Sequence, residues 1–288
     1  MPRLHSDLRV VYSASRYREA RSDQVPFLKG ALAMRYELIE LEYEGDFATI
    51  TMNNPKRRNA LSLKHMTELT AAFREAGEST ARGVFLAARG PVFSAGHDFA
   101  DMVGQDLEAM RKILKVCNTL MDTIQEIPQP VLARVHGLAT AAGCQLVATC
   151  DLAVASTEAG FATPGGKGGW FCTTPMVAVS RNIGRKRALE MLLTGDTIDA
   201  QTAADWGLVN RVVPPDLLVE ESQRLLEAAT RGSFISKGIG KQAYYAQIDM
   251  SQSQAYAYAL EVMAATSQIP DAQEGMRAFL EKRKPRFK

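Results

Sequence analysis

The sequence predicts an α/β fold with parallel strands. Three observations support this class: short apolar runs alternate with helical segments, the helical segments carry one apolar face, and the last third of the chain is almost entirely helical. Of the 288 residues, 46% are hydrophobic and 23% are charged, which is typical of a globular chain. A chain of this length fits one large domain or two small ones.

The first half of the chain supplies the expected sheet. Strands are expected where apolar or alternating runs end at Gly, Pro or Asn, and helices where apolar residues recur every three or four positions. Ser62 fits an N-cap, and Pro128 with Pro130 ends the long second helix. The expected elements are strands 38–43 and 47–52, helix 62–76, strand 84–88, helix 107–124, strand 131–135, helix 141–149 and strand 151–155.

The second half is expected to be mainly helical. A glycine-rich loop at 163–174 precedes it, and a short strand at 208–213 interrupts it. We divide the chain into an N-terminal extension (1–33) interpreted as disordered, an α/β core (34–213) and a helical C-terminal region (214–288). The expected helices beyond residue 175 lie near 185–193, 216–230, 235–246, 252–267 and 271–282.

Charge and cysteine content exclude several classes of protein. The 34 basic and 32 acidic residues leave a net charge of +2, so a nucleic-acid partner is not expected. No apolar run reaches the ~18 residues that a membrane span needs. The four cysteines form no CxxC, and the four histidines lack i, i+4 spacing, so we expect no metal site. Reduced thiols indicate a cytoplasmic compartment, or the mitochondrial matrix if the source is eukaryotic.

Two segments carry unusual runs of small residues. Residues 90–98 follow a buried strand, and residues 136–145 run from a strand into a helix. Small residues allow a sharp turn and a close approach of the backbone, and a helix N-terminus presents free N–H groups. Two such turns can aim two N–H groups at one oxygen, which is an oxyanion hole. The alternative is that the small residues only permit tight packing of helix on sheet.

Five ordered motifs identify a family. They are Asn54–Ser62, Phe93–Asp98, Gly137–Asp151, Leu193–Val209 and Glu274–Pro285, and together they resemble the crotonase (enoyl-CoA hydratase/isomerase) family from about residue 36 to the end. The resemblance implies a spiral of ββα units with a helical C-terminal trimerisation region. It also implies a lyase or isomerase of fatty acid metabolism that binds acyl-CoA thioesters, with coenzyme A as part of the substrate and no separate cofactor. A homotrimer or a dimer of trimers is expected.

The resemblance also assigns site residues. The oxyanion N–H groups would be those of His97 and Ala142. A further set of residues would contact the substrate and its coenzyme A. This set consists of Lys56, Arg57, Arg58, Ala60, Ala95, Gly96, Asp98, Phe99, Phe171, Phe279 and Lys282. For Asp98, capping of the following helix is the competing interpretation.

The sequence departs from the family's hydratases at two catalytic positions. The resemblance places their two acids at Gln145, which cannot titrate, and at Gly165, which has no side chain. Efficient hydration is therefore doubtful. One alternative is a short-chain acyl-CoA decarboxylase acting on methylmalonyl-CoA-like substrates, because family decarboxylases also carry a histidine at the His97 position. Their tyrosine, however, falls at Phe171. The other alternative is a non-catalytic acyl-CoA-binding protein.

Overall fold

The computed structural model describes residues 36–287 and divides the chain into two compact units. The first unit extends from Tyr36 to Ala229, and the second begins at Thr230. The predicted N-terminal extension (1–33) lies outside the described residues. The segment expected to be helical from residue 214 contributes α8 (Leu218–Thr230) to the first unit.

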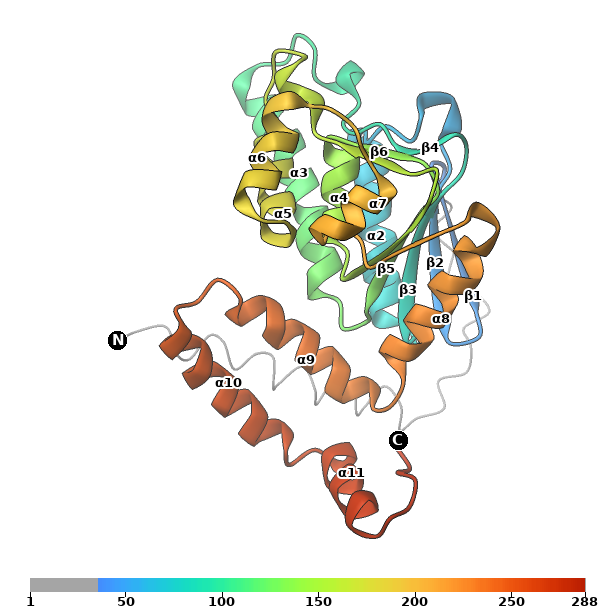
Figure 1. Ribbon diagram of the computed structural model, residues 1–288, viewed down its shortest axis with the longest axis vertical. Coiled ribbons are helices and arrows are strands. Elements are labelled where there is room, and N and C mark those ends of the chain that lie inside the picture. Colours follow the sequence, from blue (N-terminus) through green and yellow to red (C-terminus); the bar gives the residue numbers. More distant parts are fainter. Residues whose placement is uncertain (1–35, 288) are drawn as a thin grey trace. The chain divides into compact units, whose positions relative to one another are not determined.

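The larger sheet has six strands and forms the centre of the first unit (Figure 1). The first two strands pair as an antiparallel hairpin, and all later neighbours pair in parallel. Parallel neighbours require crossovers, which the intervening helices provide. In spatial order the strands are β1 (Ile39–Glu44), β2 (Phe47–Met52), β3 (Gly83–Ala88), β5 (Val131–Val135), β7 (Leu152–Ser156) and β10 (Arg211–Val213).

A second sheet of four short strands stands beside the ends of the first. Between residues 83 and 182, three successive turns of the chain each add one strand to the larger sheet, one strand to the smaller sheet and then a helix, as in the predicted ββα spiral. In spatial order the strands are β4 (Val92–Ser94), β6 (Leu138–Thr140), β8 (Gly160–Ala162) and β9 (Ile198–Asp199). The remaining helices of this unit are α2 (Leu63–Glu78), α3 (Leu107–Glu126), α4 (Ala142–Thr149), α5 (Pro175–Asn182), α6 (Arg185–Thr194) and α7 (Ala200–Trp206).

The two faces of the larger sheet bury different helices. Alternate residues of a strand point to opposite faces, so one face packs on α2, α3 and α4 while the other packs on α8. On the α8 face, Leu218 and Leu226 contact a cluster that includes Phe85, Leu132 and Val154. The sheet is therefore covered on both sides, as parallel sheets usually are.

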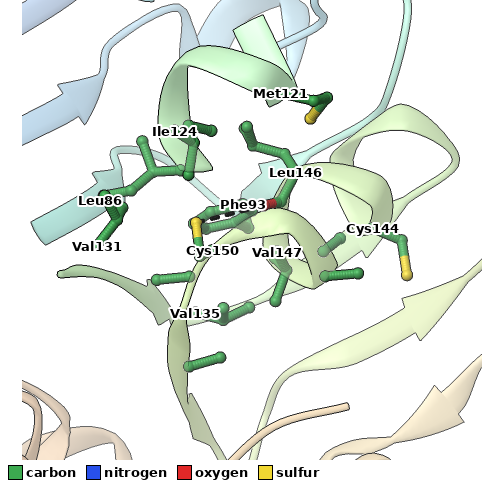
Figure 2. Close-up of a cluster of buried hydrophobic side chains, with 14 of the residues drawn as sticks. Leu86, Phe93, Met121, Ile124, Val131, Val135, Cys144, Leu146, Val147 and Cys150 are labelled. Carbon is green, nitrogen blue, oxygen red and sulfur yellow. Dashed lines mark hydrogen bonds between the residues drawn. The ribbon is translucent and has the colours of Figure 1, made fainter. Parts of the chain in front are cut away.

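Helix α4 is the most deeply buried helix of the unit. All eight of its residues are buried, because small side chains let it lie between the sheets and α3. Figure 2 shows Leu146 and Val147 of α4, and Cys150 just after its end, among side chains from α3 and β5, with the Cys150 thiol donating to the Leu146 carbonyl. The four cysteines are free thiols and are buried. Burial fixes the N-terminus of α4 rigidly relative to the strands.

The second unit consists of three helices, α9 (Phe234–Gln247), α10 (Gln252–Thr266) and α11 (Pro270–Leu280). A buried hydrogen bond of 2.6 Å from the Ser233 hydroxyl to the Asp271 carboxylate joins the starts of α9 and α11. Helix α10 has no buried residue, although Tyr256, Leu260 and Met263 are large and apolar. Within residues 36–287, no helix combines the length and the apolar character that crossing a bilayer requires.

The long elements agree with the predicted ones to within a few residues, and the short ones do not. Strands β4, β6, β8 and β9 have only two or three residues, too few to show an alternating pattern, and none of them lies in an expected strand. The last strand spans 211–213 rather than 208–213. Helix α7 was not expected, because its seven residues carry too little apolar periodicity.

The docking of α8 on the sheet generates a first prediction. We expect Leu226→Ala to lower the free energy of unfolding by about 2–5 kcal/mol, because a fully buried leucine leaves a cavity between α8 and the sheet. The matched control is Val219→Ala on the same helix, where the side chain is 59% exposed and the change should stay within about 0.5 kcal/mol. Urea unfolding followed by circular dichroism measures both. Equal effects of the two variants would contradict this packing.

Candidate active site

The first backbone turn of the site follows β4. Gly96 has φ +85°, which favours glycine, and a Cβ there would lie 2.9 Å from the Thr140 carbonyl oxygen and 3.1 Å from the Ala142 nitrogen. Both distances are shorter than ordinary contacts, so only glycine fits. The absence of a side chain at residue 96 thus lets the first turn touch the start of α4.

The direction of the His97 N–H follows from how its neighbours pair. The Leu61 N–H donates to the Gly96 carbonyl at 2.7 Å, and the Asp98 N–H donates to the Leu61 carbonyl at 3.2 Å. Residue 97 therefore forms an isolated parallel bridge with Leu61. Successive N–H groups of an extended segment point to opposite sides, so the His97 N–H points away from Leu61.

The second turn leads from β6 into α4. Ala141 has φ 52° and ψ −119°, an uncommon conformation for a residue with a side chain, and its N–H donates to the Ala162 carbonyl at 2.9 Å. Ala142 is the first residue of α4, so its N–H has no acceptor within the helix. A Cβ on Gly143 would lie 2.5 Å from the Ser94 carbonyl oxygen, which shows how closely α4 approaches the end of β4.

A pocket of about 360 Å³ opens at the junction of the two turns. Both turns contribute to it, the first through Ala95, His97 and Asp98 and the second through Ala141. The glycine-rich loop forms another part of the wall. The other lining residues are Ala60, Phe99, Leu114, Gly165, Trp170, Phe171, Cys172, Thr173, Thr174 and Pro175. Most of these side chains are apolar, so the pocket suits the acyl part of a ligand.

His97 contributes a neutral side chain to this region. Burial lowers the pKa of its imidazole to about 4, so the ring is uncharged at neutral pH. Its Nε2 atom is buried and has no hydrogen-bond partner among the described residues. The imidazole therefore adds no positive charge to the pocket wall.

The Asp98 carboxylate interacts with two groups, the Ala100 N–H and the Arg57 guanidinium. One carboxylate oxygen accepts a hydrogen bond of 3.0 Å from the Ala100 N–H and also lies 2.6 Å from Arg57 Nη2. Asp98 thus caps the 3-10 turn Phe99–Asp101, whereas the following helix α3 is capped by Asp106. Burial raises the pKa of the Asp98 carboxyl group, but its hydrogen bonds to Arg57 and Ala100 outweigh that effect and lower it below its ordinary value. The guanidinium of Arg57 is thus held at the first turn, while Lys56 and Arg58 are exposed beside it.

Gly165 occupies a space that is closed to any side chain. A Cβ on it would lie 2.2 Å from the Trp170 carbonyl oxygen and 2.8 Å from Cys172 Sγ. Its own N–H donates to Cys172 Sγ at 3.3 Å. The loop from 165 to 172 has folded back over the position where the resemblance would place a hydratase carboxylate. Gly165 is therefore not simply a truncated glutamate.

The other predicted residues divide into three groups. Ala60, Ala95, Phe99 and Phe171 line the pocket with His97 and Asp98. Gln145 is buried inside α4, its Oε1 has no partner among the described residues, and it is not part of the pocket lining. Phe279 and Lys282 belong to the C-terminal unit, where Phe279 is 83% exposed, and their contact with coenzyme A stays a prediction.

The sequence did not single out several lining residues as site residues. Leu114 follows the apolar spacing of α3, and nothing in that spacing separates a pocket residue from a core residue. Ala141, Thr173 and Thr174 lie within segments that were recognised, but the sequence did not distinguish them from their neighbours as lining residues. No group of three or more potential metal ligands gathers within residues 36–287.

Comparison with known proteins gives a consistent result. A family model described as enoyl-CoA hydratase/isomerase matches residues 42–288. The mitochondrial enoyl-CoA hydratase domain-containing protein 3 of Rattus norvegicus is 43% identical over 238 residues, covering 82% of this chain and 79% of its own. This is the branch of the family that residues 141–148, 161–165 and 170–172 together resemble.

Solved structures agree in fold over nearly the same length. An enoyl-CoA hydratase from Mycobacterium smegmatis superposes with a TM-score of 0.84 and 44% identity, covering 87% of this chain and 98% of its own. Human enoyl-CoA hydratase domain-containing protein 3 superposes with a TM-score of 0.83 and 40% identity, covering 87% and 100%. The predicted crotonase fold is confirmed, and the chain belongs to the enoyl-CoA hydratase/isomerase family.

Proposed function

We propose that this protein is an acyl-CoA enzyme that holds the thioester carbonyl with the N–H groups of His97 and Ala142 and stabilises the enolate formed there. The observation that carries this proposal is the close approach of the two turns, where a Cβ added at Gly96 would lie only 3.1 Å from the Ala142 nitrogen. Backbone donors fixed in this way need no reorganisation when charge develops, and each is worth roughly 2.7–4 kcal/mol.

The environment of the pocket strengthens this role. The charge of Asp98 is balanced by Arg57, and the imidazole of His97 is neutral, so no unpaired charge from these side chains competes with an enolate oxygen. The surrounding wall is mostly apolar, and hydrogen bonds to a developing charge are stronger where water is excluded. Electrostatic stabilisation is therefore supplied mainly by the backbone.

The closed space at Gly165 argues against hydration by a pair of carboxylates. Neither Gly165 nor Gln145 can accept or donate a proton to water, and no carboxylate fits at residue 165 without moving the loop. This favours a second candidate function, decarboxylation of a methylmalonyl-CoA-like substrate. Loss of CO₂ leaves its bonding electrons in an enolate, and the step needs the oxyanion hole but no base.

Three further parts of the proposal rest on less direct support. The exposed apolar residues of α10 support a homotrimer or a dimer of trimers. The exposed Lys56 and Arg58 support binding of the phosphates of coenzyme A. The free cysteines support a location in a reducing compartment such as the cytoplasm. The rat relative is named as mitochondrial, which supports the mitochondrial matrix as the alternative location.

The oxyanion hole is tested by Ala142→Pro. Proline is tolerated at the first position of a helix but lacks the N–H, so we expect the enolate of bound acetoacetyl-CoA, followed by its ultraviolet absorbance, to be about 100- to 1000-fold less favoured. Ala142→Gly keeps the N–H and should resemble the parent protein. An unchanged enolate equilibrium in a folded Ala142→Pro variant, checked by circular dichroism, would remove Ala142 from the hole.

The same proteins distinguish the candidate reactions. Hydration of crotonyl-CoA and release of CO₂ from methylmalonyl-CoA are measured side by side for the parent and Ala142→Pro. Rapid hydration would contradict our emphasis on Gln145 and Gly165. Release of CO₂ that the variant loses would support decarboxylation. Failure of both reactions together with tight binding of acyl-CoA would identify a non-catalytic binding protein.

The closure of the glycine-rich loop is tested at two of its glycines. We expect Gly165→Ala to lower the melting temperature and weaken acyl-CoA binding, because the added methyl group meets the Trp170 carbonyl. Gly168→Ala is the matched control, since its nearest neighbour would be 3.6 Å away, an ordinary contact. Thermal unfolding and isothermal titration with acetoacetyl-CoA measure the two effects. If the two variants behave alike, the space at Gly165 is open after all.

The neutral state of His97 is tested by the dependence of stability on pH. The imidazole pKa is 6.5 when unperturbed and about 4 in the fold, so the unfolded chain binds the proton more tightly and stability falls as the pH drops through this range. The loss should be about 3 kcal/mol greater for the parent than for His97→Asn between pH 7 and pH 4. Urea unfolding across this range measures it, and parallel curves for the two proteins would show that His97 is not buried as a neutral ring.

A further inference from the structure

The first turn of the site is supported from one side by the segment that precedes α2. The Ala95 N–H donates to the Arg58 carbonyl at 3.0 Å, and Leu61 then bonds to both Gly96 and Asp98. These bonds alternate along two chain segments that are more than thirty residues apart in sequence. The orientation of the peptide between Gly96 and His97 therefore depends on how residues 58–61 are held.

Asn59 is the residue that holds this segment. It is fully buried, and its side-chain nitrogen donates to the Arg89 carbonyl at 2.8 Å and to the Val92 carbonyl at 3.1 Å. Its side-chain oxygen accepts from the Asn54 N–H at 2.9 Å. Both donors of the amide are used, and they bind the two carbonyls that bracket the start of β4. The side chain thus joins three separate points of the backbone.

The backbone of Asn59 reaches further toward the site. Its carbonyl accepts a hydrogen bond of 2.8 Å from the Ser94 hydroxyl, and the Ser94 oxygen in turn accepts from the Gly96 N–H at 3.3 Å. A continuous chain of hydrogen bonds therefore leads from Asn59 to the residue just before His97. Asn59 also has φ 50°, a left-handed conformation that asparagine tolerates better than most residues with a side chain.

Resting on the proposed function, we infer that Asn59 is a positioning residue that sets the direction of the His97 backbone N–H in the oxyanion hole. It lies outside the pocket lining and acts through Ser94, Gly96 and Leu61. Its removal would leave the Arg89 and Val92 carbonyls without their donor and would free the end of β4 to shift. A donor displaced by a fraction of an ångström stabilises the enolate less, while binding of the rest of the ligand is retained.

The test compares Asn59→Ala with a matched control, Gln129→Ala. Gln129 is also a fully buried amide that donates to backbone carbonyls, those of Ala76 and Ala81, but at the far end of α2. We expect both variants to lose stability, and only Asn59→Ala to reduce the enolate equilibrium of bound acetoacetyl-CoA, by about tenfold. The dissociation constant of free coenzyme A should change less than about twofold in either variant, because the thioester carbonyl is absent from it.

A second measurement, amide hydrogen exchange, tests the role of Asn59 without relying on the proposed reaction. Amide hydrogen exchange of the peptide spanning residues 92–98 should become about tenfold faster in Asn59→Ala and stay unchanged in Gln129→Ala. If the parent protein does not stabilise the enolate, the proposed function fails while the exchange experiment still decides the role of Asn59. Exchange and enolate equilibrium that match the Gln129→Ala control would overturn the inference. Asn59→Ser serves the same comparison if the alanine variant does not fold.

Discussion

The site depends on one close backbone approach, between the turn at Gly96 and the start of α4. Two parallel strand units can bring their turns together only if side chains are missing at the contact, and glycines at 96 and 143 meet that condition. The burial of α4 on all sides then fixes where its first N–H lies. The proposed oxyanion hole is therefore a consequence of packing, since the same small residues that admit the helix also leave its first N–H without an acceptor in the helix.

The glycine-rich loop differs from a loop in which one side chain is missing and nothing else has changed. If a glutamate had been replaced by glycine without other change, an empty space would remain beside residue 165. Instead the Trp170 carbonyl and the Cys172 thiol fill that space, and the Gly165 N–H bonds to the sulfur. The wall is closed at this position, and the loop as folded leaves no room for an acidic side chain at residue 165.

The sequence predicted the fold well where periodicity is long enough to be read. The hairpin, the buried strands and α3 each contain enough residues to show their spacing, and the N-cap role of Ser62 is confirmed by its hydrogen bond to the His65 N–H. The second sheet was missed, because a strand such as β6 is determined by its pairing with β4 and β8 and not by a pattern within its three residues. The hypothesis of two meeting turns came from small residues alone, and only coordinates could show that Gly96 and Ala142 touch.

The sequence alone does not reveal the hydrogen bonds that hold the turn from outside the pocket. Asn59 appears in a motif as a polar residue near basic ones, and such a residue on a loop is ordinarily exposed to water. In the fold it is buried, with both amide donors and its carbonyl engaged by β4 and the residues around it. Burying an amide is costly unless its hydrogen bonds are made, and the Asn59 side chain makes them with the backbone on both sides of the turn. In the proposed oxyanion hole, the direction of the His97 N–H therefore depends on a residue outside the pocket as well as on the turn itself.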